Sequence, residues 1–344
     1  MRTIKQLLIL AIVFSTFTLF AQQKVALHSN GVTTIFGGAN PFTNAYNASS
    51  SGDTIYLPGG NLPYPTTIDK GLVIIGAGYH PDSTTTTLPT VLSGDLTISQ
   101  NADNLWLEGI EITGGISFNT NHKIDSVTIR RCKFSTLTYA GNGTTPCVDN
   151  VIRENVISGA VNLGNAASSM LSNNIIGGQI SNASNIGISN NIFLSNPNST
   201  AYYNIPFYIV NSCFISNNII FRNYGGGAYV YSNCNLNTFS NNIFTLVPDA
   251  GTNTFTGNYN SIDIATVFIN QSGNAFDYNH DYHLVDPASY LGTDGSQVGI
   301  YGGMYPIKDG AVPQNPHFQF KNISTQTDNN GELNIQIQVE AQDY

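Results

Sequence analysis

The sequence predicts an all-β fold, a single-stranded right-handed parallel β-helix of roughly eight to ten coils. The first observation is a repeated hexapeptide, "LSNNII" from residue 171, "ISNNIF" from 188, "ISNNII" from 215 and "FSNNIF" from 239. Looser copies, "LEGIEI", "IRRCKF" and "IRENVI", begin at residues 107, 129 and 152. The copies start 17 to 27 residues apart, which fits one coil of three short strands. They are rich in Ile, Val and Asn, residue types that favour strands and turns over helices.

The fourth position of the repeat predicts an asparagine ladder inside one corner of the coils. Stacked strands lie about 4.8 Å apart, and an amide can donate to one neighbour while it accepts from another. Asparagine also tolerates the left-handed backbone of a sharp bend. We therefore assign a structural role to Asn155, Asn174, Asn191, Asn218 and Asn242, with Asn258 continuing the row. The sixth position supplies the buried apolar stack: Ile112, Phe134, Ile157, Ile176, Phe193, Ile220 and Phe244.

The fifth position predicts an aliphatic row that strand alternation turns outward. An exposed apolar ridge on a folded protein is either covered by a loop or used as a contact surface. We favour loop cover, with self-association or a protein partner as the alternative. The row consists of Val156, Ile175, Ile192, Ile219 and Ile243.

Residues 1–21 have the pattern of a secretory signal peptide. Arg2 and Lys5 precede an apolar stretch from Leu7 to Phe20, and Ala21 offers a small residue for cleavage. The stretch is shorter than the roughly 20 apolar residues of a membrane-spanning helix. We expect an exported protein, in the periplasm, on the outer surface or outside the cell, with no integral membrane segment after cleavage.

Composition excludes one class of binding partner, and it leaves open whether the cysteines form disulfides. The formal net charge is −9 and only 10% of residues are charged, so we expect no binding to nucleic acid. Export would permit disulfides. Cys213 and Cys234 could form one, as less readily could Cys132 and Cys147, or all four could be buried thiols.

Three segments resemble the pectate-lyase-like β-helix superfamily of secreted bacterial proteins. "NPFTNAYNASSSGDTIYLPGG" (residues 40–60) is similar to its capping helix and first strand, and "DKGLVIIGAG" (69–78) to its second coil. "DYHLVDPASYLGTDGSQVGIYGG" (281–303) is similar to its closing coil. The resemblance implies a β-helix within residues 22–305, with a cap at about 40–60 and a closing coil at about 281–303.

The tail at residues 306–344 differs in pattern. "HFQFKNIS" and "ELNIQIQVEA" alternate polar and apolar residues around "TDNNG", a strong turn signal. We expect a C-terminal β-hairpin that plugs the end of the solenoid, where the last coil would expose a strand edge. An export or attachment signal is the alternative.

The enzymes of this superfamily act on acidic polysaccharides, and the resemblance implies an Arg or Lys base with Ca²⁺ held by carboxylates. The candidates are Arg130, Lys133, Arg153 and Glu154, with Glu108 and Glu111 as further ligands. The alternative is that these charges, with Arg131, pair between neighbouring coils. We favour pairing, because no motif of a particular lyase matches and no acidic residue lies between Glu154 and Asp249.

Two other groups are candidate binding sites. "FDYNHDYH" holds Asp277, His280, Asp281 and His283, which could ligate a divalent metal; a solvated or capping role is the simpler interpretation. An aromatic cluster on an uncharged, Asn-rich stretch could stack on sugar rings or pack against the coils. It consists of Tyr202, Tyr203, Tyr208, Tyr224, Tyr229 and Tyr231.

These observations favour a non-catalytic exported protein in carbohydrate binding, adhesion or cell-surface structure. Its partner would be a polysaccharide or cell-surface glycan, and it would need no cofactor. One alternative is a polysaccharide lyase, the only case that would require Ca²⁺. The other is a structural scaffold that binds protein partners along the aliphatic row.

Overall fold

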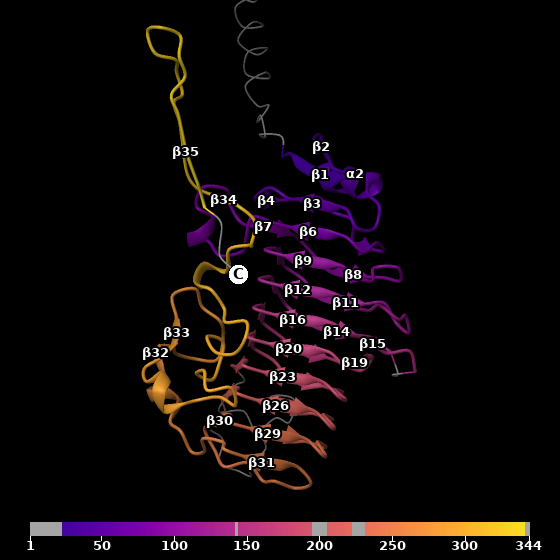
Figure 1. The fold of residues 1–344 in the computed structure, drawn as a ribbon, viewed down its shortest axis with the longest axis vertical. Coiled ribbons are helices and arrows are strands. Elements are labelled where there is room, and N and C mark those ends of the chain that lie inside the picture. Colours follow the sequence, from indigo (N-terminus) through magenta and orange to yellow (C-terminus); the bar gives the residue numbers. More distant parts are fainter. Residues whose placement is uncertain (1–22, 142–143, 195–204, 222–230, 341–344) are drawn as a thin grey trace, which may run out of the picture.

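The computed structural model describes residues 23–141, 144–194, 205–221 and 231–340. Three long sheets of short strands run along a solenoid, and neighbouring strands within them are parallel except at the N-terminal end (Figure 1). Parallel pairing between successive copies of the repeat confirms the all-β solenoid. Within the described residues, no helix is long and apolar enough to span a membrane.

The first sheet has twelve strands. They are, in spatial order, β2 (Val32–Phe36), β1 (Val25–Ser29), β3 (Thr54–Tyr56), β6 (Val73–Ile75), β9 (Trp106–Glu108), β12 (Thr128–Arg130), β16 (Val151–Arg153), β20 (Met170–Ser172), β23 (Gly187–Ser189), β26 (Phe214–Ser216), β29 (Thr238–Ser240) and β31 (Thr254–Thr256). The second sheet has nine: β4 (Gly60–Asn61), β7 (Thr90–Leu92), β10 (Glu111–Ile112), β13 (Lys133–Phe134), β17 (Val156–Ile157), β21 (Ile175–Ile176), β24 (Ile192–Phe193), β27 (Ile219–Ile220) and β30 (Ile243–Phe244).

The third sheet has eight strands: β5 (Thr67–Ile68), β8 (Leu96–Ile98), β11 (Ile116–Phe118), β14 (Leu137–Tyr139), β18 (Val161–Asn162), β22 (Ile180–Ser181), β25 (Phe207–Tyr208) and β28 (Tyr231–Ser232). A short parallel pair, β15 (Cys147–Val148) and β19 (Ala166–Ala167), extends one edge of two coils. One strand from each long sheet makes up a coil. Without the antiparallel β1 and β2, the three sheets have ten, nine and eight strands, in agreement with the expected number of coils.

The sixth position of the repeat lies in the core between the sheets, as predicted. Each of its side chains, from Ile112 to Phe244, is buried in one cluster that runs the length of the solenoid. The N-terminal end of this core is closed by helix α2 (Pro41–Ala48), whose Phe42, Ala45 and Tyr46 are buried. The capping helix expected within residues 40–60 is therefore present, and β1 and β2 add two antiparallel strands beyond it.

The asparagine ladder is present, but the bend itself is made one residue earlier. The Nδ2 of Asn155 donates to Oδ1 of Asn174 at 3.0 Å, and the same bond repeats through Asn242 to Asn258. The left-handed residue is at the third position of the repeat, where φ lies between 49° and 70°. These residues are Gly109, Arg131, Glu154, Asn173, Asn190, Asn217, Asn241 and Gly257. The fourth position thus supplies hydrogen bonds, and the third supplies the turn.

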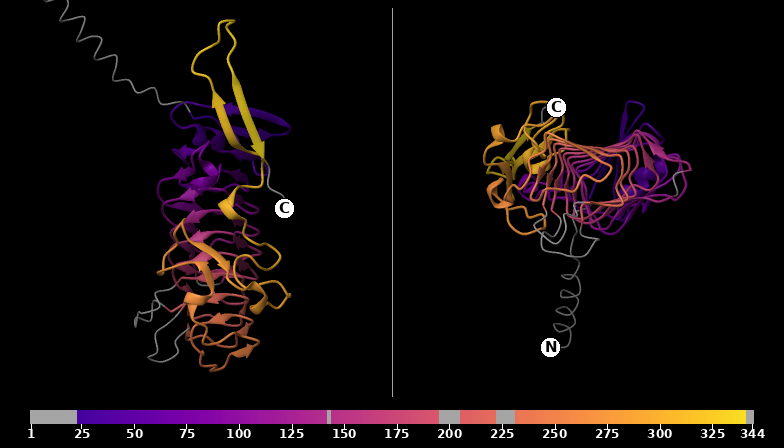
Figure 2. Two further views of the ribbon diagram at one scale, coloured as in Figure 1. Left: turned by 90° about the vertical axis from the view of Figure 1, so that its left-hand side faces the viewer. Right: turned by 90° about the horizontal axis from the view of Figure 1, so that it is seen from below.

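Residues 281–303 do not form a closing coil. β33 (Asp281–Leu284) pairs antiparallel with β32 (Phe268–Asn270) and with none of the described solenoid strands. These strands belong to a segment, residues 262–316, that leaves the last coil and lies against one side of the solenoid (Figure 2). We call it the strap. It also contains three short 3₁₀ turns, η3 (Ile264–Thr266), η4 (Pro287–Ser289) and η5 (Asp309–Ala311).

The strap covers the outward aliphatic row, as favoured from the sequence. The five side chains of that row are at most 3% exposed. They form a second apolar cluster with Val267, Phe268, Tyr282, Leu284, Val298 and Ile300 of the strap. Two apolar cores therefore lie on opposite faces of the second sheet, one inside the solenoid and one beneath the strap.

The third position of the repeat anchors the strap. Asn241 Nδ2 donates to the carbonyl of Leu291 at 3.0 Å, Asn217 Oδ1 accepts from the amide of Thr293 at 2.9 Å, and Asn173 Nδ2 donates to the carbonyl of Ile300 at 2.9 Å. At the early coils Arg131 Nη1 donates to the carbonyl of Val312 at 2.8 Å. Residues 291–312 of the strap therefore run back along the solenoid toward its N-terminal end.

The C-terminal hairpin is confirmed, but it does not plug the last coil. β34 (His317–Ile323) pairs antiparallel with β35 (Ile335–Glu340). The hairpin starts beside the early coils, where the Thr86 hydroxyl donates to the carbonyl of Gln319 at 2.8 Å, and it projects from the end opposite β31 (Figure 1). Its apolar residues Leu333, Ile335, Ile337 and Val339 are 46–53% exposed. The return of the strap along the solenoid explains this position.

All four cysteines are free and buried, so of the alternatives that the sequence left open the structure has buried thiols and no disulfide among them. The amide of Cys213 donates to Oδ1 of Asn237, and the Cys234 thiol accepts from the amide of Val210. The two cysteines thus occupy different rows of the corner and do not stack on each other. Burial raises the pKa of the Cys132 thiol to about 12, which favours the unreactive protonated form.

Candidate functional site

The charged residues of the early coils form a buried ion cluster. Glu108, Arg130, Arg131 and Glu154 are each at most 4% exposed. Glu154 accepts from Arg131 Nε and from Arg153 Nη1, both at 2.6 Å. Arg130 Nε lies 3.2 Å from Glu108 Oε1, in an ion pair that lacks hydrogen-bond alignment. Charges on neighbouring coils pair with one another, as the sequence favoured.

The strap covers this cluster. The amide of Gln314 donates to Glu108 Oε1 at 2.9 Å, beside the bond from Arg131 to the carbonyl of Val312. The Tyr305 ring lies 4.1 Å from the guanidinium carbon of Arg153. A lyase base or Ca²⁺ ligand must reach its substrate or its metal, whereas these groups are covered and engaged. The sequence did not indicate this cover, since it comes from residues over 150 positions later.

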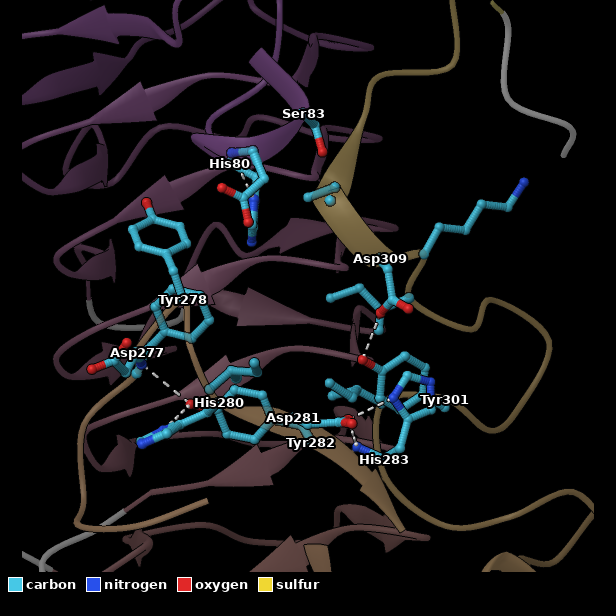
Figure 3. A pocket seen from close by; sticks show the side chains of 18 of the residues that line it. His80, Ser83, Asp277, Tyr278, His280, Asp281, Tyr282, His283, Tyr301 and Asp309 are labelled. Atoms are coloured by element: carbon cyan, nitrogen blue, oxygen red, sulfur yellow. Dashed lines mark hydrogen bonds and ion pairs between the residues drawn. The ribbon is translucent and has the colours of Figure 1, made fainter. Parts of the chain in front are cut away.

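A cleft of about 470 Å³ opens between the strap and the early coils. On the solenoid side, the cleft is lined by Tyr79 and His80, in the loop that leads into η1 (Asp82–Thr84), and by Asp82 in η1 itself. The strap contributes residues 276–278 and 280–283 around β33, the pair Ile300 and Tyr301, and residues 307–311. The volume lies within the range of small-molecule binding sites. Figure 3 shows Tyr278 and His80 on one side of the cleft and Tyr301 with Asp309 on the other.

One wall of the cleft is a connected set of two carboxylates and two rings. His283 Nδ1 lies 2.7 Å from Asp281 Oδ1, and the His283 ring stacks on Tyr301 with 3.7 Å between centroids. The Tyr301 hydroxyl donates to Asp309 Oδ1 at 2.8 Å. Hydrogen bonds and stacking hold each ring in place, so this wall is preorganised (Figure 3).

The opposite wall rests on Lys133, a lyase candidate outside the buried cluster. Lys133 Nζ donates to the Tyr278 hydroxyl and to Glu111 Oε1, both at 2.9 Å. The His80 ring meets Tyr278 edge to face at 4.9 Å. Lys133 therefore positions a cleft tyrosine and at the same time pairs with the next coil.

The electrostatic state of the cleft follows from burial and hydrogen bonding. Burial lowers the pKa of His80 below its usual 6.5, which favours a neutral ring at neutral pH. The amide of His283 is the main reason that the pKa of Asp281 is lowered, so this carboxylate stays ionised. Burial, followed by the bond to Asp309, raises the pKa of Tyr301 well above 10 and keeps its phenol protonated.

Comparison of the chain with protein-family models, with curated protein sequences and with solved structures finds no match to any of them. The site must therefore be interpreted from its own geometry.

The predicted metal ligands lie at this cleft but do not form a ligand set. Asp277 caps the turn at Asn279, and Asp281 bonds to His283, while the His280 ring faces the Tyr282 hydroxyl at 3.3 Å. Within the described part of the chain, no three His, Cys, Asp or Glu side chains converge to hold a metal ion. The solvated or capping role fits these contacts better.

The predicted tyrosine cluster is mostly outside the described residues. Tyr202, Tyr203, Tyr224 and Tyr229 lie there, and Tyr231 is described only as part of β28. Tyr208 is half-buried on β25, in register with Ser181 of β22.

Sequence reasoning missed the aromatic residues that line the cleft. His80, Tyr278 and Tyr301 belong to segments that follow no repeat, and the strap brings them together. The one local signal in the sequence is "FDYNHDYH", whose aromatic residues line the cleft together with its Asp and His residues.

Proposed function

We propose that the protein is an exported carbohydrate-binding β-helix, right-handed and pectate-lyase-like, that holds a saccharide in this cleft without cleaving it. One observation carries the proposal: a cleft of about 470 Å³ combines ring faces, at Tyr278 and Tyr301, with fixed hydrogen-bonding groups, at Asp281 and Asp309. Rings supply apolar area to the faces of a sugar, and carboxylates accept from its hydroxyl groups.

The proposal is supported by how the cleft is held. Each of the two tyrosines is fixed through its hydroxyl, by Lys133 or by Asp309. Binding then requires little further ordering of side chains, which lowers the entropic cost of association. His283 covers one face of Tyr301, and Lys133 Nζ lies 4.9 Å from the centre of the Tyr278 ring, so the sugar would contact the remaining face of each ring.

Cleavage of an acidic glycan is supported less well. An Arg or Lys base must be free to take a proton from the sugar, and a base must lie within hydrogen-bond reach of that proton. Arg130, Arg131 and Arg153 are engaged with carboxylates beneath the strap. Lys133 is occupied by Glu111 and Tyr278.

The test is calorimetric titration of the full mature chain with short neutral and amino-sugar oligosaccharides. Tyr301→Ala and Tyr278→Ala should each weaken binding about tenfold or more, since removing a stacked ring costs on the order of 1 kcal/mol or more. Tyr56→Ala is the matched control, because Tyr56 is 39% exposed on β3, outside the cleft. Binding that survives both cleft substitutions would place the saccharide outside this cleft and overturn the proposal.

A second assay separates binding from catalysis. The protein is mixed with pectate, alginate and chondroitin, with and without Ca²⁺, and the ultraviolet absorbance of an unsaturated uronate product is followed. We expect no rise. A rise that Arg130→Ala, Lys133→Ala or Arg153→Ala abolishes would replace the proposal with a lyase.

A further inference from the structure

The cleft is strongly acidic. Four carboxylates line it, those of Asp82, Asp277, Asp281 and Asp309, against the single ammonium group of Lys308. With the histidines neutral the lining carries a net charge of −3. The carboxylates come from three places in the chain, η1, the neighbourhood of β33, and η5, so they surround the cleft rather than form one surface patch.

Two of these carboxylates keep an acceptor free for a ligand. Asp281 and Asp309 make their bonds to His283 and Tyr301 through Oδ1. Within the described residues, Oδ2 of Asp281 and Oδ2 of Asp309 accept no hydrogen bond. The internal bonds fix the orientation of each carboxylate, and the second oxygen can accept from a ligand at the same time.

The rings beside them also favour positive charge. The faces of Tyr278 and Tyr301 carry the negative part of the aromatic quadrupole, which attracts cations. Lys133 Nζ already lies 4.9 Å from the centre of the Tyr278 ring and His283 stacks on one face of Tyr301, so a ligand cation would use the remaining faces. Because Tyr301 stays protonated, it adds a neutral ring to the acidic wall and not a further anion. A uronate would instead meet like charge on several sides of the cleft, and burying like charges next to each other opposes binding.

We propose that the saccharide held in the cleft is an amino sugar whose amino groups are free and protonated, as in oligomers of glucosamine. This inference rests on the proposed function and deepens it. The sugar ring would stack on a tyrosine, and its ammonium group would lie against Oδ2 of Asp281 or Asp309. An N-acetylated amine has no charge and would forgo that interaction.

The experiment compares glucosamine oligomers with N-acetylglucosamine oligomers of the same length, by calorimetry on the full mature chain. The glucosamine oligomer should bind about tenfold or more tightly, the scale of a charge-assisted hydrogen bond. The difference should shrink as salt is raised, since the screening length falls from about 10 Å at 0.1 M salt to about 3 Å at 1 M.

Isosteric variants assign the effect to the cleft. Asp281→Asn and Asp309→Asn keep an oxygen for His283 and Tyr301 but lose the charge, so each should weaken glucosamine binding about tenfold and leave N-acetylglucosamine binding unchanged. Glu332→Gln, at an exposed site in the hairpin, is the control and should change neither. Unaltered melting temperatures would show that all variants fold.

The outcomes separate this inference from the proposed function. Equal or tighter binding of the acetylated oligomer overturns the amino-sugar inference and keeps the carbohydrate site. A trilysine peptide that binds as tightly as the glucosamine oligomer would also overturn it, because charge alone would then suffice. If no saccharide binds, the proposed function itself fails.

Discussion

Asn191 donates from Nδ2 to Oδ1 of Asn218 at 3.0 Å, across 27 residues of sequence and one coil of the solenoid. The same nitrogen also donates to the carbonyls of Leu171 and Ser189. Its Oδ1 accepts from both the amide and the side chain of Asn174. Most of these groups are buried, and Ser189 is half-buried, so the side chain satisfies the turn backbone of two successive coils and bonds to the side chain of a third.

Asn191→Ala should therefore lower the free energy of unfolding by about 3 to 5 kcal/mol, because several buried polar groups lose their partners at once. Urea denaturation followed by circular dichroism measures the change. Asn274→Ala, at an exposed position of the strap, is the matched control and should have almost no effect. A loss below about 1 kcal/mol for Asn191→Ala would show that water or a shifted neighbour replaces the amide.

Glu154→Gln removes the charge that two arginines share. Of its ion pairs with described residues, Arg131 would keep only the longer one with Glu108, at 3.5 Å, beside its bond to the carbonyl of Val312. We therefore expect a loss of about 3 to 5 kcal/mol, typical of breaking a buried ion pair. The control is Glu111→Gln, whose pair with Lys133 has side chains that are 22% and 26% exposed; it should cost about 1 kcal/mol or less. Equal effects of the two substitutions would mean that burial beneath the strap does not strengthen the cluster.

Ile192→Asp tests the second apolar core. Ile192 is fully buried between β24 and the strap, and a carboxylate there would be desolvated without a partner. We expect the strap to detach while the solenoid persists: proteolysis within residues 262–316 should accelerate severalfold, with little change in the β-sheet circular dichroism. Val247→Asp, at a site that is 60% exposed, should behave like the native protein. Loss of all sheet signal would instead show that strap and solenoid fold as one unit.

His80 predicts a pH dependence of stability. Its pKa in the folded protein is lowered by burial, against the weaker opposite influence of Asp82 and Asp309. As the pH falls below about 6.5, His80 becomes protonated in the unfolded chain but stays neutral in the folded protein. The free energy of unfolding should therefore fall across that window. His80→Gln removes this contribution, and melting curves between about pH 7 and pH 5 should show a smaller loss than in the native protein.

His28→Gln, which replaces an exposed histidine on β1, is the control for that experiment and should keep the native pH dependence. If His80→Gln and the native protein lose stability in parallel, then His80 keeps its ordinary pKa in the fold.

The sequence alone determined the rows that run along the solenoid. The asparagine ladder, the apolar stack ending at Phe244 and the C-terminal hairpin were predicted from residue types at regular or adjacent positions, whereas the capping helix was predicted from the resemblance of residues 40–60 to a known superfamily. The rows can be predicted in this way because each coil contacts only the coils next to it, so the residues of one repeat determine what the same positions of the next repeat contact. The sequence left open whether Cys213 and Cys234 form a disulfide. The structure places them in different rows, since a spacing near one repeat does not by itself put two residues in the same row.

Only the tertiary structure decided where the strap lies, and with it the cleft. His80, Tyr278 and Tyr301 are separated by up to about 220 residues in the printed sequence, and their contacts follow no period. The strap returns along the solenoid because it covers the aliphatic row and satisfies the third-position asparagines, whose side chains point outward from the bend. Burial of that row and pairing of those amides are properties of the assembled surface, and no local pattern within residues 262–316 records them.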